Sequence, residues 1–214
     1  MAREATVKAL LDIRKTYDVI EQAYVEYCFG DSTCEQRAVY QLVMTQIPII
    51  NVNNNCSTGS TALYLARQAI EFGIVDCALA LDFEKMSKGS LAANFNDHTS
   101  PLDTTISNLS ETPNSPFMAQ VFGNAGIEYC EKYGANAEHM AKIGEKIIVI
   151  DVYSLEQIKS SPQVFGPLTK LQCCPTSDGS AAVIYELATV SPNLLELRSS
   201  IELAGADMTR KAAK

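Results

Sequence analysis

The stretch between residues 47 and 83 constrains the fold of this chain more than any other part of its sequence. It opens with a β-branched apolar run, Ile47 to Val52, which is typical of a strand. Ser57 to Phe72 follows with apolar residues at helical spacing, and Gly73 stands where a helix C-cap is expected. Val75 to Phe83 is a nearly continuous apolar run, which fits a strand buried on both faces of a sheet. This order predicts a βαβ unit with parallel strands and therefore an α/β fold.

The flanking sequence predicts further elements. Val7, Leu10 and Leu11 fall at helical spacing and indicate an amphipathic surface helix near the start of the chain. Pro48 favours an edge position for the first strand of the βαβ unit. We expect helices over residues 2–14, 34–44, 118–133 and 137–146, strands over residues 23–29 and 181–185, and weak helical character over residues 193–214.

Composition narrows the possible partners. The formal net charge is −8 and no basic cluster is present, so nucleic acid is not expected to bind. No apolar run reaches the roughly 20 residues that a membrane-spanning helix needs, so we expect no transmembrane segment. The seven cysteines are odd in number, and with only two histidines and no C-x-x-C pair they predict free thiols and no metal site.

Cys56 is the candidate catalytic residue. It lies in NVNNNCSTGSTALYLARQ, between a predicted strand and a predicted helix, which places its sulfur at a helix N-terminus. Cysteines at such positions commonly have lowered pKa values, because the helix dipole favours an anion. Asn53, Asn54 and Asn55 are expected to hydrogen-bond neighbouring loops and hold the turn. The other cysteines are interpreted mainly as buried small hydrophobes, most firmly Cys77.

Several motifs, in order along most of the chain, resemble thiolases of the sterol carrier protein type. They are GDST with QRAVY, NNNCSTGSTALYLARQAI, ALDFEKMSKGSL, FGNAGIEYCEKYG with EHMAKIG, and LQCCPTSDGSAA. The resemblance implies the five-layered α/β/α/β/α thiolase fold in the full enzyme, of which this chain carries mainly the N-terminal βαβ half and a loop-domain insertion. It divides the chain into residues 1–83, the insertion 84–167, and residues 168–214, which finish this half.

The resemblance also implies an activity: acyl transfer from a 3-ketoacyl-CoA to coenzyme A through a thioester on Cys56, in fatty-acid or sterol side-chain metabolism. Coenzyme A and acyl-CoA are then substrates, with no covalently bound cofactor and with no cofactor-binding residues assigned. A homodimer formed through Ile47 to Val52 and a peroxisomal location are expected, with mitochondrion or cytoplasm as alternative locations.

The departures from the family pattern leave other functions open. The sequence contains no His-Asp-Cys, Gly-His-Pro or Cys-x-Gly motif, and His98 and His139 match no catalytic position. We therefore expect a truncated chain with little turnover alone. A non-catalytic thiolase-like subunit that binds acyl-CoA or a partner is one alternative. A related condensing or hydrolytic enzyme that uses Cys56 is another.

Overall fold

The fold was obtained as a computed structural model. It describes residues 1–86, 107, 115–147, 153–174 and 177–187. They fall into two compact units, with residues 1–86 and 177–187 in one and residues 107, 115–147 and 153–174 in the other. Among the described residues, no helix is long and apolar enough to span a bilayer.

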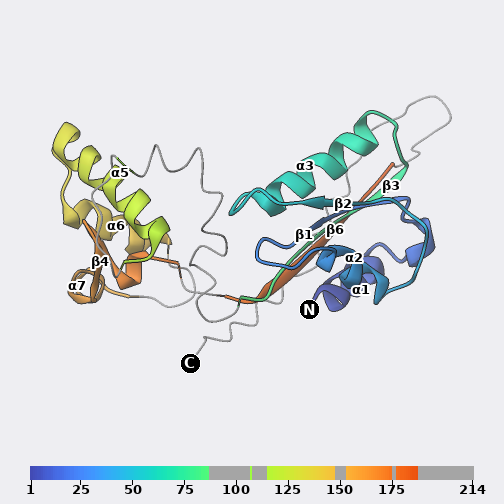
Figure 1. Cartoon of the computed structure of the whole chain (residues 1–214), viewed down its shortest axis with the longest axis horizontal. Coiled ribbons are helices and arrows are strands. Elements are labelled where there is room, and N and C mark those ends of the chain that lie inside the picture. The colour runs from blue at the N-terminus through green and yellow to red at the C-terminus, as the bar shows by residue number, and fades with distance from the viewer. Residues whose placement is uncertain (87–106, 108–114, 148–152, 175–176, 188–214) are drawn as a thin grey trace. The chain divides into compact units, whose positions relative to one another are not determined.

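The first unit is built on a mixed sheet with the strand order β2-β1-β3-β6 (Figure 1). Its strands are β1 (Gln22–Glu26), β2 (Ile49–Val52), β3 (Cys77–Glu84) and β6 (Gly179–Glu186). Both β2 and β3 pair with β1 in parallel, whereas β6 pairs with β3 in antiparallel. The predicted βαβ unit is therefore confirmed, with β1 lying between its two strands. β2 is an edge strand of the described sheet, as Pro48 predicts.

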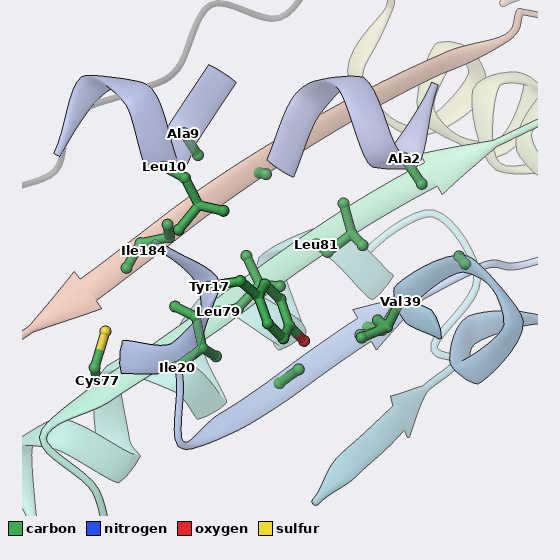
Figure 2. Close-up of a cluster of buried hydrophobic side chains, with 14 residues drawn as sticks. Ala2, Ala9, Leu10, Tyr17, Ile20, Val39, Cys77, Leu79, Leu81 and Ile184 are labelled. Atoms are coloured by element: carbon green, nitrogen blue, oxygen red, sulfur yellow. The ribbon is translucent and has the colours of Figure 1, made fainter. Parts of the chain in front are cut away.

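Helix α3 (Thr58–Glu71) covers one face of this sheet, and α1 (Ala2–Asp12) and α2 (Cys34–Tyr40) cover the other (Figure 1). On the α3 face, small residues of the helix pack on Tyr24, Ala78 and Ala80 of the strands. On the opposite face, Leu79 and Leu81 of β3 meet the residues of α1 and α2, together with Ile184 of β6 (Figure 2). The five residues at the start of β3 are buried, which confirms a strand enclosed on both faces.

The face of α1 that packs on the sheet differs in part from the predicted one. Val7 and Leu11 are exposed, although their spacing indicated the buried side. Leu10 is buried as its spacing indicated, and Ala2, Thr6 and Ala9 are buried beside it. Close packing on the strands selects small side chains here, and the hydroxyl of Thr6 donates to the carbonyl of Ala2 at 3.0 Å, which satisfies it within the helix.

The second unit contains three helices and a short hairpin among its described residues. The helices are α5 (Phe117–Tyr133), α6 (Ala137–Ile147) and α7 (Leu155–Ser160), and the hairpin pairs β4 (Gln163–Phe165) with β5 (Leu168–Thr169). Gly134, with φ of 68°, ends α5. The sequence predicted α5 and α6 within two residues at each end, but it did not predict α7 or the hairpin. The weak helix expected over residues 193–214 lies outside the described residues.

Candidate active site

Cys56 lies in the connection between β2 and α3, directly before Ser57, the N-cap residue of the helix. It is exposed to solvent. The connection leaves the C-terminal end of a parallel strand, which is the edge where open α/β sheets bind their ligands. The predicted placement of Cys56 at a strand-to-helix turn is therefore confirmed.

Three asparagines hold the turn in place, as the sequence predicted. Asn53 Nδ2 donates to the carbonyl of Cys28 at 3.1 Å and so ties the turn to the end of β1. The backbone N–H of Asn54 donates to Thr58 Oγ1 at 2.7 Å, while its side chain donates to Thr61 Oγ1 at 3.3 Å. Asn55 has a φ of 49°, a left-handed conformation that Asn tolerates better than most residues. These bonds fix the backbone on both sides of Cys56.

The first turn of α3 offers hydrogen-bond donors. The Ser57 side chain makes no cap bond to the helix, and the first turn contains no acidic residue. Among the described residues, the backbone N–H groups of Gly59 and Ser60 have no acceptor. Such unpaired amides at a helix N-terminus attract negative charge. They are suitable donors for an oxyanion that forms next to Cys56.

Three carboxyl groups lie at the same end of the sheet: Glu26 from β1, and Asp82 and Glu84 from β3. Burial, and after it the neighbouring Asp82 carboxylate, raises the pKa of Glu26 to about 8. Burial also raises the pKa of Asp82 and of Glu84 above their ordinary values. Glu84 is partly compensated, because its Oε2 accepts the backbone N–H of Cys28 at 3.2 Å.

A second thiol belongs to this neighbourhood. Cys28 is only half-buried, although the sequence suggested a buried position, and its Sγ lies 3.9 Å from Asn55 Oδ1. Burial raises the pKa of the Cys28 thiol, and the negative charges of Glu84, Cys56, Glu26 and Asp82 raise it further. Cys28 is therefore a weaker nucleophile at neutral pH than its exposure alone suggests.

The remaining predicted side chains lie elsewhere. Cys77 is buried, as predicted, and burial raises its pKa to about 12. His139 is an exposed residue of α6 whose Nδ1 accepts the Asn136 N–H at 3.3 Å, so it is the surface residue expected. Cys173 is half-buried and Cys174 is exposed. His98 lies outside the described residues.

Sequence reasoning missed the carboxyl groups. The signal was present, because Glu26 ends β1 and Asp82 lies near the end of the mostly apolar β3, in QAYVE and CALALDFE. Charged residues are almost never fully buried unless they have a partner. Two of them at neighbouring strand ends therefore indicate a shared site, but only once strand order is known.

The fold agrees with the comparison to known families. The family description "Thiolase, N-terminal domain" matches residues 15–146. The chain belongs to the thiolase family, and its α/β fold is that of the thiolase N-terminal domain.

Individual relatives make the resemblance to the sterol carrier protein type specific. The chain is 46% identical to "Sterol carrier protein 2" of Homo sapiens, an alignment that covers 100% of this chain and 46% of that protein. It is 38% identical to "Non-specific lipid-transfer protein-like 2" of Caenorhabditis elegans, covering 100% of this chain and 61% of the relative. It is 28% identical to "Benzoylsuccinyl-CoA thiolase subunit BbsB" of Thauera aromatica, over 78% of this chain and 44% of that protein.

A solved structure supports the fold alone. The chain superimposes on "Ltp2-ChsH2(DUF35) aldolase" with a TM-score of 0.65 and 18% sequence identity, covering 86% of this chain and 49% of the other. The chain thus spans about half the length of several proteins that it matches.

Proposed function

We propose that this chain is the nucleophile-bearing half of an acyl-CoA acyltransferase of the 3-ketoacyl-CoA thiolase type. The observation that carries the proposal is the position of Cys56, exposed at the N-terminal end of α3 and at the C-terminal edge of the parallel strands. One relative is named as a benzoylsuccinyl-CoA thiolase subunit, which supports acyl-CoA as the substrate class.

The proposed reaction has two halves. The Cys56 thiolate attacks the 3-keto carbon of the substrate, and the bond between C2 and C3 breaks. Its electron pair leaves with acetyl-CoA, which takes up a proton at C2. The thiolate of coenzyme A then attacks the Cys56 thioester, releases the shortened acyl-CoA and returns Cys56 to its thiolate.

The described residues supply part of what this reaction needs. The unpaired N–H groups of Gly59 and Ser60 are suited to stabilise an oxyanion, which typically contributes a large share of the rate. The hydrogen bonds of Asn53 and Asn54 hold the backbone of the turn that contains Cys56. The titratable groups at this end of the sheet include Cys28 and the three carboxyl groups, and none of the described residues there is a histidine.

The test is acylation of Cys56. The purified chain is incubated with acetoacetyl-CoA and with a medium-chain 3-ketoacyl-CoA, and its intact mass is followed. The expected result is a thioester adduct on the peptide that contains Cys56, absent in Cys56→Ser and unchanged in a Cys174→Ser control. No adduct on Cys56 under conditions where the protein binds acyl-CoA would overturn the proposal.

The second candidate is a non-catalytic subunit that binds acyl-CoA or lipid. It is favoured by the three carboxyl groups at the same end of the sheet, since they put negative charge where a thiolate would form. The names of the sterol carrier and lipid-transfer relatives fit this reading too. The same experiment separates the two, because this candidate predicts saturable acyl-CoA binding without an adduct.

Assembly and location complete the proposal. β2 is a described edge strand, and its unpaired side is suited to pair with β2 of a second copy, which supports a homodimer.

By family resemblance the working location is the peroxisome. Immunofluorescence of the endogenous protein with a peroxisomal marker tests it, and a diffuse or mitochondrial signal contradicts it.

A further inference from the structure

Glu26 and Asp82 face each other across two parallel strands. They are register partners at the C-terminal ends of β1 and β3. Because side chains alternate along a strand, Glu26 points to the same side as Tyr24, and Asp82 to the same side as Ala80. Tyr24 and Ala80 both pack against α3. The two carboxyl groups therefore lie under the first turn of α3.

Glu26 is buried with only weak compensation, because the Thr58 hydroxyl lowers its pKa less than burial and Asp82 raise it. Its side chain is 7% exposed, and its Oε2 has no hydrogen-bond partner among the described residues. The hydroxyl of Thr58 lies close by, but its single proton goes to the carbonyl of Asn55. An ionised carboxylate would leave the buried Oε2 without a donor, which is costly in free energy. A proton on Glu26 removes the charge and supplies a donor for the Asp82 carboxylate.

Both carboxyl groups lie beside the same residue of α3, Gly59. A Cβ atom at Gly59 would lie 2.8 Å from Glu26 Oε2 and 2.9 Å from Asp82 Oδ2. Any residue other than glycine would therefore displace the pair or the helix. Gly59 stands in the first turn of α3, only three positions after Cys56. The carboxyl pair therefore packs beneath the turn that carries Cys56.

We propose that Glu26 and Asp82 share one proton and form a carboxylic acid–carboxylate hydrogen bond. This hydrogen-bonded pair packs against Gly59 and supports the turn that carries Cys56. Glu26 donates and Asp82 accepts, so the pair carries one negative charge, directed at the N-terminus of α3 where the helix dipole favours it. The two residues touch no substrate in this role and act as a positioning pair.

The surroundings make this support sensitive to alkaline pH. Glu84 of β3 and the thiol of Cys28 face the pair, and each adds negative charge when it ionises. None of the groups that act on Glu26 or Asp82 is basic among the described residues. Despite the three carboxyls, the described part of the chain contains no arrangement of ligands suited to a metal ion. Loss of the shared proton therefore leaves two carboxylates repelling each other beneath Gly59.

The test is an NMR titration of the full chain. Side-chain carboxyl carbons report the protonation of Glu26 and Asp82, and backbone amide signals report the local environment of Gly59 and Ser60. In the wild type, the carbons of both residues are expected to shift together at alkaline pH, with the Gly59 and Ser60 amides following at the same midpoint. In Glu26→Gln and Asp82→Asn the amide shift is expected to vanish, because an amide keeps the hydrogen bond without a titrating proton.

A matched control comes from the opposite end of the same strands. Glu21 accepts the Asp76 N–H at 2.6 Å there, and Glu21→Gln is expected to leave the Gly59 titration unchanged. The inference is overturned if the carbons of Glu26 and Asp82 titrate separately in the ordinary carboxyl range, or if Gly59 still titrates in both pair variants. The wild-type carbon titration decides the matter even if a variant fails to fold. No step of the test involves acyl transfer, so its outcome is independent of the proposed reaction.

Discussion

Asn53 donates a 3.1 Å hydrogen bond from its side chain to the carbonyl of Cys28, and this bond joins the β2–α3 turn to the end of β1. Two cysteines that are 28 positions apart by their residue numbers, Cys28 and Cys56, are thereby held at one end of the sheet. They differ in environment, since Cys28 is half-buried and Cys56 is exposed. Their chemistry is expected to differ accordingly.

Cys56 is expected to be the most reactive of the seven thiols. Burial raises the pKa of Cys28, Cys34, Cys77 and Cys173, which lowers their thiolate fraction at neutral pH. Cys174 is exposed too, but the next described element after it is the strand β6 and not a helix. Iodoacetamide labelling at neutral pH, read by peptide mass spectrometry, measures the order. Earlier labelling of Cys28 or Cys174 contradicts the expectation.

The stability of the protein is expected to fall as pH rises, and Glu26→Gln to reduce that fall. Below the ordinary pKa of 4.5, Glu26 is protonated in both folded and unfolded chains, so its contribution is complete. As pH rises, the unfolded chain loses the proton first, and stability is lost until the folded pKa of about 8 is passed. After allowance for partial exposure, the variant should recover roughly 1–3 kcal/mol near the upper end of this window. Urea unfolding at several pH values measures it.

The control for this series is Glu21→Gln at the other end of the strands, which should keep the wild-type slope between the two pKa values. Parallel curves for the wild type and Glu26→Gln would show that Glu26 titrates normally in the folded chain.

Gly59→Ala is expected to destabilise the protein by about 1–3 kcal/mol, because the new methyl group meets two buried carboxyl oxygens. Gly179→Ala is the matched control, since a Cβ there meets nothing within 4 Å. Thermal and urea unfolding give the difference. Equal stability of the two variants would mean that the carboxyl groups move aside freely.

The 214-residue chain is expected to acylate slowly at most, without repeated turnover. Each general acid or base typically contributes roughly 100- to 10,000-fold to the rate, and the described site offers no histidine beside Cys56. Acetoacetyl-CoA cleavage with coenzyme A, beside a Cys56→Ala control, measures turnover. Steady turnover at an ordinary enzyme rate, lost in the control, would show that the site contains acid–base groups that the sequence did not reveal.

The proposed homodimer predicts a specific weakness. Asn51 is exposed on the edge strand β2, and Asn51→Lys should place two like charges at a symmetric contact. Light scattering is expected to show a dimer for the wild type, a shift towards monomer for Asn51→Lys, and a dimer for Ala125→Lys on exposed α5. A monodisperse wild-type monomer would rule out this contact.

Local signals in the sequence predicted the strands and helices around Cys56 well. Apolar runs and the glycine after the helix placed β3 and α3 within two residues at each end, because burial on both faces and αL capping leave clear patterns. The predicted face of α1 was right for Leu10 and wrong for Val7 and Leu11, because the choice between Val7 and Ala9 depends on how closely the helix approaches the strands. The carboxyl pair was missed, because it exists only once β1 lies beside β3, and strand order is not a local property.

β6, the last strand of the described sheet, follows its partner β3 only after a long stretch of chain. Ser180 of β6 donates its hydroxyl to the carbonyl of Asp82 at 2.8 Å, 98 positions further along the chain. During synthesis β3 therefore remains an open, apolar edge until the intervening residues have left the ribosome, and such edges pair readily with other chains. Contacts this distant in sequence also slow folding. The nascent protein therefore passes through a stage in which the apolar edge of β3 lacks its partner strand β6 and is open to pairing with other chains.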